Sequence, residues 1–144
     1  EYVFDADVDP LVIGSIDFAS KLADPTGYQA AVVVDIVGRA EQLLPPDSDS
    51  WYLARSLVRE FWGVAQGRAA RSFEENVRYE VLDAHIPLLG VGIPAICLID
   101  VDDPHWHTLD DTPHHCDPGA LQEVGEVLWD WLRLRMTNPS ANQL

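Results

Sequence analysis

Two short runs of apolar residues constrain the fold of this chain more than any other feature. The first occupies residues 30–37, is rich in valine and contains Asp35 near its end, and the second occupies residues 95–99. Both runs are too uniformly apolar for strands that keep one face in water, so we expect buried strands of a parallel sheet. A Gly-Ile-Pro turn at residues 92–94 introduces the second run. The pattern predicts a central strand with Asp35 at its carboxyl end and a second buried strand after the turn.

Amphipathic segments alternate with these runs. Residues 15–23 have helical spacing, and after a loop over residues 38–50 a second helix is predicted from Trp51 to about Gly67. Asp117 and Pro118 provide an N-cap and a first-turn proline for a last helix. The expected core residues of that helix are Leu121, Val124, Val127, Leu128, Trp131 and Leu132. Alternating strands and helices predict an α/β fold with a mostly parallel sheet and helices on both faces.

The length of the chain limits this fold to one domain. With 144 residues, of which 47% are hydrophobic, the chain can bury one core but not two independent ones. We expect a single domain over residues 1–136 and a polar tail over residues 137–144. Residues 1–4 have the pattern of a strand, so we expect that an upstream portion of the domain precedes Glu1.

The charge balance excludes two classes of partner. Lys and Arg total 9 against 24 Asp and Glu, which gives a formal net charge of -15. Such a surface repels phosphate backbones and anionic lipids, so we expect no nucleic acid partner. No apolar run reaches the roughly 18 to 20 residues needed to cross a bilayer, so we expect no membrane insertion.

Acidic and imidazole side chains fall where the predicted strands end. In a parallel sheet, ligands bind outside the carboxyl ends of the strands, and we expect Asp7, Asp35, Asp83 and His107 to meet at that rim. Carboxylates and imidazoles are ligands of zinc, and a catalytic zinc site needs about three of them plus an open position for water. For Asp35 the alternative is a structural role in the turn after the strand.

The other histidines carry weaker signals. In an extended segment, His105 and His107 would point to the same side, but an isolated His-x-His pair is weak evidence for a metal site and fits a solvated loop as well. The sequence His114-His115-Cys116 before the last helix is also more typical of a solvated loop than of a metal site.

Five short elements follow one another along the chain: Ile-Gly-Ser-Ile-Asp-Phe-Ala at 13–19, Val-Asp-Ile-Val-Gly at 34–38, Asp-Ala-His-Ile-Pro-Leu-Leu at 83–89, Gly-Ile-Pro at 92–94 and Trp-His-Thr-Leu-Asp-Asp at 106–111. Through the last three, residues 82–111 closely resemble the M28 zinc peptidase family and, within it, the glutaminyl cyclase branch. The two upstream elements are similar to motifs that stand in the same order in that family. The resemblance implies the three-layer sandwich of the zinc aminopeptidases and phosphorylases, with the N-terminal part of the domain missing.

The resemblance also implies roles for individual residues. His107 matches the family's last zinc ligand, and Trp106 matches a wall of the substrate pocket. Asp35 matches a carboxylate that binds the second metal in the aminopeptidases and joins a hydrogen-bond network near the single zinc in the cyclases. The implied cofactor is zinc, and the implied compartment is periplasmic or extracellular.

Three positions, Asp7, Val8 and Ala84, depart from the family pattern. The family's Phe-Asp-Gly-Glu-Glu stands here as Phe-Asp-Ala-Asp-Val, which puts Asp7 at the general-base position and Val8 at a zinc-ligand position. Valine cannot coordinate zinc. Ala84 stands where the family has the Asp immediately before the histidine, which is His85 here. We expect Asp83 to substitute for this Asp only if the local register shifts. The family's early His and bridging Asp ligands would lie upstream of Glu1.

These departures favour a degenerate domain. We expect a metal-poor, catalytically impaired M28-like domain that serves as a binding or assembly subunit with a protein or peptide partner, for which an exposed Trp129 would be a candidate contact. A hetero-oligomer, in which a separate N-terminal fragment supplies the first strands and ligands, is a further arrangement. The alternative is an active zinc-dependent aminopeptidase or glutaminyl-peptide cyclotransferase acting on peptide N-termini. In that case His107 and Asp35 hold the metal, and Asp7, Asp35 and Asp83 are the catalytic carboxylates.

Overall fold

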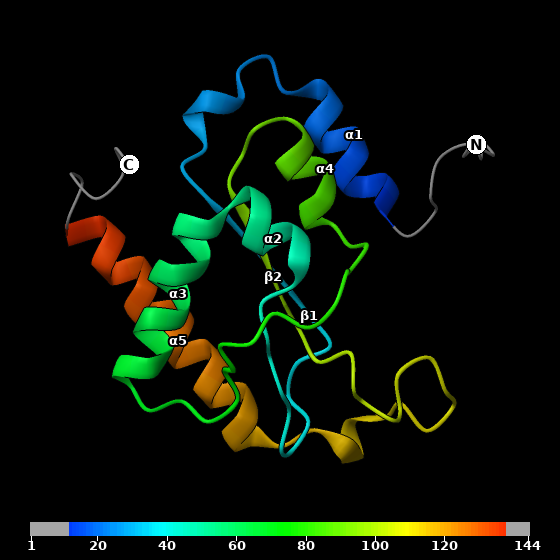
Figure 1. Cartoon of the computed structure of the whole chain (residues 1–144). Helices are drawn as coiled ribbons and strands as arrows, with labels where there is room; N and C mark the ends of the chain where they lie inside the picture. Colours follow the sequence, from blue (N-terminus) through cyan, green and yellow to red (C-terminus); the bar gives the residue numbers. More distant parts are fainter. Residues whose placement is uncertain (1–11, 138–144) are drawn as a thin grey trace.

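The computed structural model describes residues 12–137 and shows helices packed around a pair of strands (Figure 1). The predicted strand at residues 1–4 and the tail from residue 138 lie outside the described residues. The elements run in the order α1 (Ile13–Lys21), η2 (Pro25–Gly27), β1 (Ala31–Asp35), α2 (Ser48–Leu53), α3 (Arg55–Gly67), α4 (His85–Gly90), β2 (Ala95–Ile99), η3 (Pro113–His115) and α5 (Pro118–Thr137).

Strands β1 and β2 pair in parallel, as the two apolar runs predict. The register runs from Ala31 opposite Ala95 to Asp35 opposite Ile99, so both strands end at the same level. Strand β2 is buried along its whole length, whereas β1 is half-buried and becomes exposed at its carboxyl end. Within residues 12–137, β1 pairs with β2 alone.

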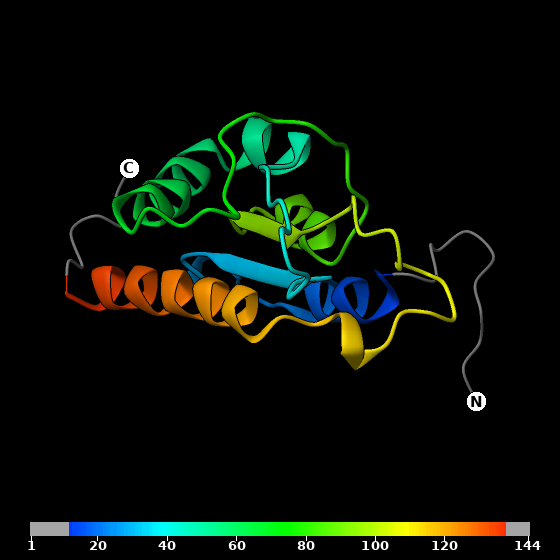
Figure 2. The same ribbon diagram turned by 90° about the horizontal axis from the view of Figure 1, so that it is seen from below.

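Helices cover both faces of the strand pair, which confirms the predicted architecture. On one face, Ile96 and Leu98 pack into a large core cluster with Phe61 of α3 and Val127 of α5. On the other face, Cys97 packs with residues of the segment that precedes α4. Figure 1 shows α3 and α5 on one side of the strands and α1 and α4 on the other, and each of these helix pairs is in contact. Figure 2 shows the same strands lengthwise, with α5 and α1 in one row below β1.

The single helix predicted from Trp51 to Gly67 is two helices in the structure. Helix α2 starts early, at Ser48, because the Asp47 carboxylate accepts a hydrogen bond of 2.9 Å from the Ser50 amide and caps it. The helical backbone is interrupted at Ala54, whose φ of -129° lies outside the helical region. The prediction missed the break because the apolar spacing continues through it on both sides.

Helix α5 begins at the predicted cap but buries a narrower stripe than expected. The Asp117 carboxylate accepts a hydrogen bond of 2.7 Å from the Ala120 amide. Leu121 and Leu132 are 44% and 41% exposed, so their prediction as core residues was wrong; they lie at the margins of the stripe centred on Val127. Trp129 is 61% exposed. Although α5 is the longest helix of residues 12–137, neither it nor any other helix there is long and apolar enough to cross a membrane.

Gly38 occupies a backbone position that only glycine fits. Its φ is +112°, and a Cβ atom there would lie 2.6 Å from Cδ2 of Leu121. We expect Gly38→Ala to lower the free energy of unfolding by about 2 kcal/mol, because strain and overlap add.

The matched control is Gly63→Ala in α3, where an added Cβ meets nothing within 4 Å. This change should raise the free energy of unfolding by about 0.5 to 1 kcal/mol, because alanine favours the helix interior. Urea titrations followed by tryptophan fluorescence measure both effects. Equal midpoints for wild type and Gly38→Ala would contradict the assignment of Gly38.

Candidate functional site

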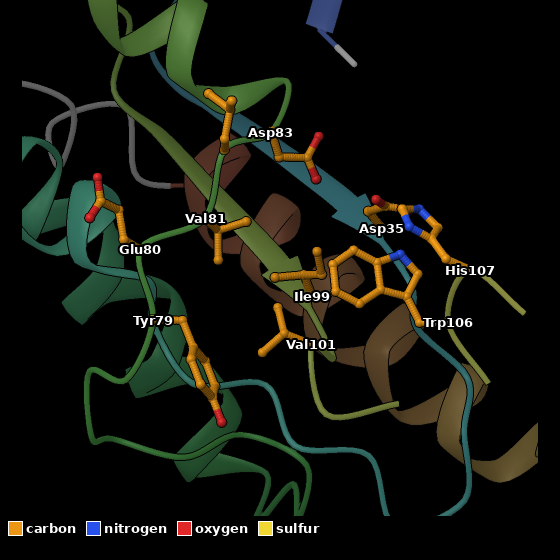
Figure 3. A pocket seen from close by; sticks show the side chains of 10 residues that line it. Asp35, Tyr79, Glu80, Val81, Asp83, Ile99, Val101, Trp106 and His107 are labelled. Atoms are coloured by element: carbon orange, nitrogen blue, oxygen red, sulfur yellow. The ribbon is translucent and has the colours of Figure 1, made fainter. Parts of the chain in front are cut away.

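A pocket of about 420 Å³ opens at the carboxyl ends of the two strands (Figure 3). Its walls come from three places: the last residues of the strands, the segment 79–83 and the loop that follows β2. The lining residues are Asp35, Tyr79, Glu80, Val81, Leu82, Asp83, Ile99, Val101, Trp106 and His107. This is the position at which parallel α/β sheets bind ligands.

Three of the four residues predicted to meet at the sheet rim line this pocket. Asp35, Asp83 and His107 are gathered at one end, and Trp106 adjoins them (Figure 3). The fourth residue, Asp7, lies outside the described residues. The fold therefore brings together side chains from distant parts of the chain: Asp35 and His107 are more than 70 positions apart.

Asp35 ends strand β1 and has two interactions of opposite effect. Its Oδ1 accepts a hydrogen bond of 2.9 Å from the Ile36 amide, which is the turn-stabilising role considered as its alternative. Burial raises the pKa of the Asp35 carboxyl, and the negative charge of Asp83 raises it further, while His107 acts in the lowering direction. Asp35 thus stabilises the turn and also forms a like-charge pair suited to holding a proton.

Asp83 lines the pocket from the segment that precedes α4. It stands two residues before His85, the first residue of α4, whereas Ala84 occupies the N-cap position of that helix. The thiol of Cys97 donates a hydrogen bond to Asp83 Oδ2 at 3.5 Å. Burial raises the pKa of the Cys97 thiol, so this group stays protonated and remains a donor. Asp83 therefore places a carboxylate in the pocket, although Ala84 stands where the family pattern has an Asp.

His105 and His107 point to different places, because the segment that carries them is a series of turns and not extended. The His105 ring stacks on the ring of His115, with centroids 3.6 Å apart and an angle of 15° between the planes. The His107 ring instead lies 4.6 Å from the Trp106 ring, and His107 has a φ of 58°. Only His107 of this pair lines the pocket.

A buried ion pair holds the loops after the two strands together. Arg39 Nε donates to Asp100 Oδ2 at 2.7 Å, and Asp100 is fully buried. The Asp100 amide also donates to the carbonyl of Ile36 at 3.2 Å. Since Asp35 precedes the first loop and the second loop carries Trp106, this pair fixes one side of the pocket against the other. The sequence gives no signal for it, because the partners are 61 positions apart.

Residues 79–83 form a wall of the pocket, and of these only Asp83 was predicted from the sequence. This segment belongs to no helix or strand, so it has no periodic pattern. Val81 packs on Cys97 and Ile99, and the Tyr79 hydroxyl donates to the carboxylate of Asp102 at 2.9 Å. The wall is therefore held by individual contacts and not by the hydrogen-bond ladder of a strand.

Zinc, the cofactor implied by the resemblance, does not fit the described residues by themselves. Within residues 12–137, no three His, Cys, Asp or Glu side chains lie close enough together to hold a metal ion. A catalytic zinc site needs about three protein ligands. Asp35 and His107 could supply two of them, and any further ligand would have to come from outside this part of the chain.

The Asp35–Asp83 pair predicts a dependence of stability on pH. A carboxyl whose pKa is raised in the fold stabilises the protein below its ordinary pKa of about 3.9, and this contribution is lost as the pH rises through the raised value. Asp35→Asn should therefore increase the free energy of unfolding at pH 7, by up to about 1 kcal/mol because water screens this partly exposed group. The gain should vanish near pH 3.

Urea unfolding at several pH values measures this difference. Asp110→Asn removes an exposed carboxylate from the loop that carries His107 and serves as the control. A loss of stability at pH 7 in Asp35→Asn would contradict the prediction, because it would mean that the ionised Asp35 carboxylate stabilises the fold.

Comparison with known proteins gives one consistent result. Glutaminyl-peptide cyclotransferase of Bos taurus is 26% identical over 137 residues, which cover 80% of this chain and 38% of the relative. The crystal structure of Fimbriiglobus ruber glutaminyl cyclase shares 35% identity with a TM-score of 0.79, over 83% of this chain and 43% of that one. A Zn-dependent exopeptidase from Parabacteroides distasonis, at 22% identity, has the same fold with a TM-score of 0.77, over 89% and 47% of the two chains.

The chain thus spans less than half the length of these relatives. The family model described as Peptidase family M28 matches residues 9–132, which include both strands, all the described helices except the last residues of α5, and every residue that lines the pocket. The chain belongs to peptidase family M28, in its glutaminyl cyclase-like branch.

Proposed function

We propose that this chain is the pocket-bearing part of an M28 domain, that it binds the N-terminal residue of peptides, and that it holds no zinc ion by itself. The observation that carries the proposal is the pairing of two carboxylates, Asp35 and Asp83, at one end of a pocket whose remaining wall is mostly apolar. Such a pocket favours a ligand with a cationic group at one end and an uncharged body.

The N-terminal residue of a peptide has this chemistry. Its α-amino group has a pKa of about 8 and is cationic at neutral pH, so it would relieve the repulsion between Asp35 and Asp83. The Trp106 ring provides an aromatic face beside the carboxylates, and aromatic faces attract cations. The apolar side chains Val81 and Ile99 suit the aliphatic part of the residue. The volume of about 420 Å³ is sufficient for one or two residues.

The absence of a self-sufficient zinc site is supported by two observations of different kinds. The described residues contain no group of three metal-binding side chains. Val8 stands at the position where the family's Phe-Asp-Gly-Glu-Glu element has a zinc-binding carboxylate, and valine has no donor atom. Without an ion to polarise a carbonyl, the pocket binds peptides and does not turn them over.

Peptide titration by isothermal calorimetry tests the proposed binding. A short peptide that begins with glutamine should bind, and the same peptide with an acetylated N-terminus should bind at least about tenfold more weakly, because acetylation removes the cation. Asp83→Asn should weaken binding of the free peptide by about tenfold, whereas Asp110→Asn should not change it. Equal affinity for the free and the acetylated peptide would contradict the proposal.

An active zinc-dependent cyclotransferase or aminopeptidase is the second candidate. The raised pKa of Asp35 beside Asp83 favours it, because such carboxyl pairs carry protons in catalysis. In this case, the missing zinc ligands come from a segment outside residues 12–137 or from a partner chain in a hetero-oligomer. For this candidate too, the family resemblance favours a periplasmic or extracellular location.

In this second case, a strand from the missing segment or from a partner chain could pair with the free edge of β1 within the described residues. Strand β1 pairs on one edge within the described residues, and Val34 is 43% exposed although it belongs to a run of three valines. Light scattering on the native complex detects such an assembly, and a glutamine cyclisation assay with added zinc detects activity. A monomeric chain without activity would exclude the second candidate for this chain alone.

A further inference from the structure

A buried contact between a carboxylate and an imidazole lies behind the pocket wall. Asp47 is 2% exposed and His85 is fully buried, and His85 Nε2 lies 3.2 Å from Asp47 Oδ1. Burial raises the pKa of Asp47, but hydrogen bonds from His85 and Ser50 more than offset this effect, so that its pKa is below the ordinary value. The carboxylate is therefore ionised at neutral pH and accepts, which makes His85 Nε2 the donor.

The N-terminus of α2 is bonded to both ends of the pocket wall. At the beginning of the wall, the amide of Ser48, the first residue of α2, donates to the carbonyl of Tyr79 at 2.8 Å. Just past its end, the N-cap residue Asp47 accepts from His85, which follows Asp83 by two residues. Two adjacent residues at the start of one helix thus hold the wall at its start and just past its end.

The position of Asp83 depends on how closely residues 79–83 pack against strand β2. Residues 79–83 form no ladder with a neighbouring strand, and they cover Cys97, which is fully buried beneath them. The Asp83 carboxylate contacts the Cys97 thiol and faces Asp35. If α4 moved, Asp83 would move away from Asp35. The first turn of α4 is held to α2 by the contact between His85 and Asp47.

We propose that Asp47 and His85 form a latch that holds residues 79–83 against strand β2 and so positions Asp83 opposite Asp35. Both are positioning residues, since they act on the pocket through the wall and touch no ligand. The effect of the latch on peptide binding rests on the proposed function above, whereas the closure of the wall does not.

The reactivity of Cys97 reports wall closure directly. The chain has two cysteines, of which Cys97 is buried and Cys116 is exposed, so a Cys116→Ser background leaves Cys97 as the only thiol. The rate of its modification by an aryl disulfide reagent in native buffer measures how often the wall opens. We expect slow modification of the parent and at least about tenfold faster modification of His85→Ala.

A matched control separates opening of the wall from general loss of stability. Val127→Ala creates a cavity in the cluster between α3 and α5, on the opposite face of the strands, and should lower the unfolding midpoint with little effect on Cys97. Equal acceleration in Val127→Ala and His85→Ala at equal loss of stability would overturn the proposal, because it would show that the pair contributes only general stability.

A milder variant keeps the test valid if His85→Ala does not fold. Asp47→Asn retains an oxygen that can cap α2 but removes the charge, and should accelerate Cys97 modification less than His85→Ala. An unchanged rate in Asp47→Asn would contradict the latch.

The same variants connect the latch to the pocket. In peptide titrations, Asp47→Asn and Asp83→Asn should each weaken binding, and their effects should not add in the double variant, because both act through the Asp83 carboxylate. Additive effects would overturn this part of the proposal. If the wild type binds no peptide, the proposed function fails, while the thiol rates still decide the latch.

Discussion

The parallel register of β1 and β2 determines where every group of the candidate site lies. Because Asp35 stands opposite Ile99, the two strands end together, and the loops that follow them open the pocket between them. The alternation of side chains places Cys97 and Ile99 on the face that the wall covers, while Ile96 and Leu98 face α3 and α5. A shift of one residue would exchange the two faces and bury the pocket residues in the core. The Arg39–Asp100 pair fixes this register at its open end.

The two carboxylates at this rim, Asp35 and Asp83, lower the stability of the fold, and the packing of the rest of the domain offsets this loss. Two carboxylates that face each other at the edge of the core disfavour the ionised form, as the raised pKa of Asp35 reflects. The wall that carries Asp83 lacks the hydrogen bonds of a strand. It is held by a few specific side-chain contacts, such as Tyr79 with Asp102 and Asp47 with His85. Functional sites commonly concentrate such locally unfavourable groups, and the large cluster around Phe61 lies on the opposite face from them.

The parts of this fold that the sequence predicts are those fixed by local patterns. Strand β2 has the predicted bounds because a Gly-Ile-Pro turn precedes a purely apolar run, and α5 begins where Asp117 and Pro118 predict. The meeting of Asp35, Asp83 and His107 follows from the rule that parallel strands bind ligands at their carboxyl ends. The break at Ala54, the stacking of His105 on His115 and the latch could not be predicted in this way. The apolar spacing continues through the break, so the pattern does not reveal it, and the other two are contacts between residues of different segments, which leave no periodic signal.

In the function that we propose, the chain provides a peptide-binding pocket but not a complete zinc site. Asp35 and His107 are the only predicted metal ligands among the described residues, and Val8 stands where a third would be needed. The most direct test is the metal content of the native, unchelated protein, measured by elemental mass spectrometry. We expect far less than one zinc per chain, with no difference between wild type and His107→Ala. A content near one zinc per chain that is lost in His107→Ala would contradict it and establish a working metal centre.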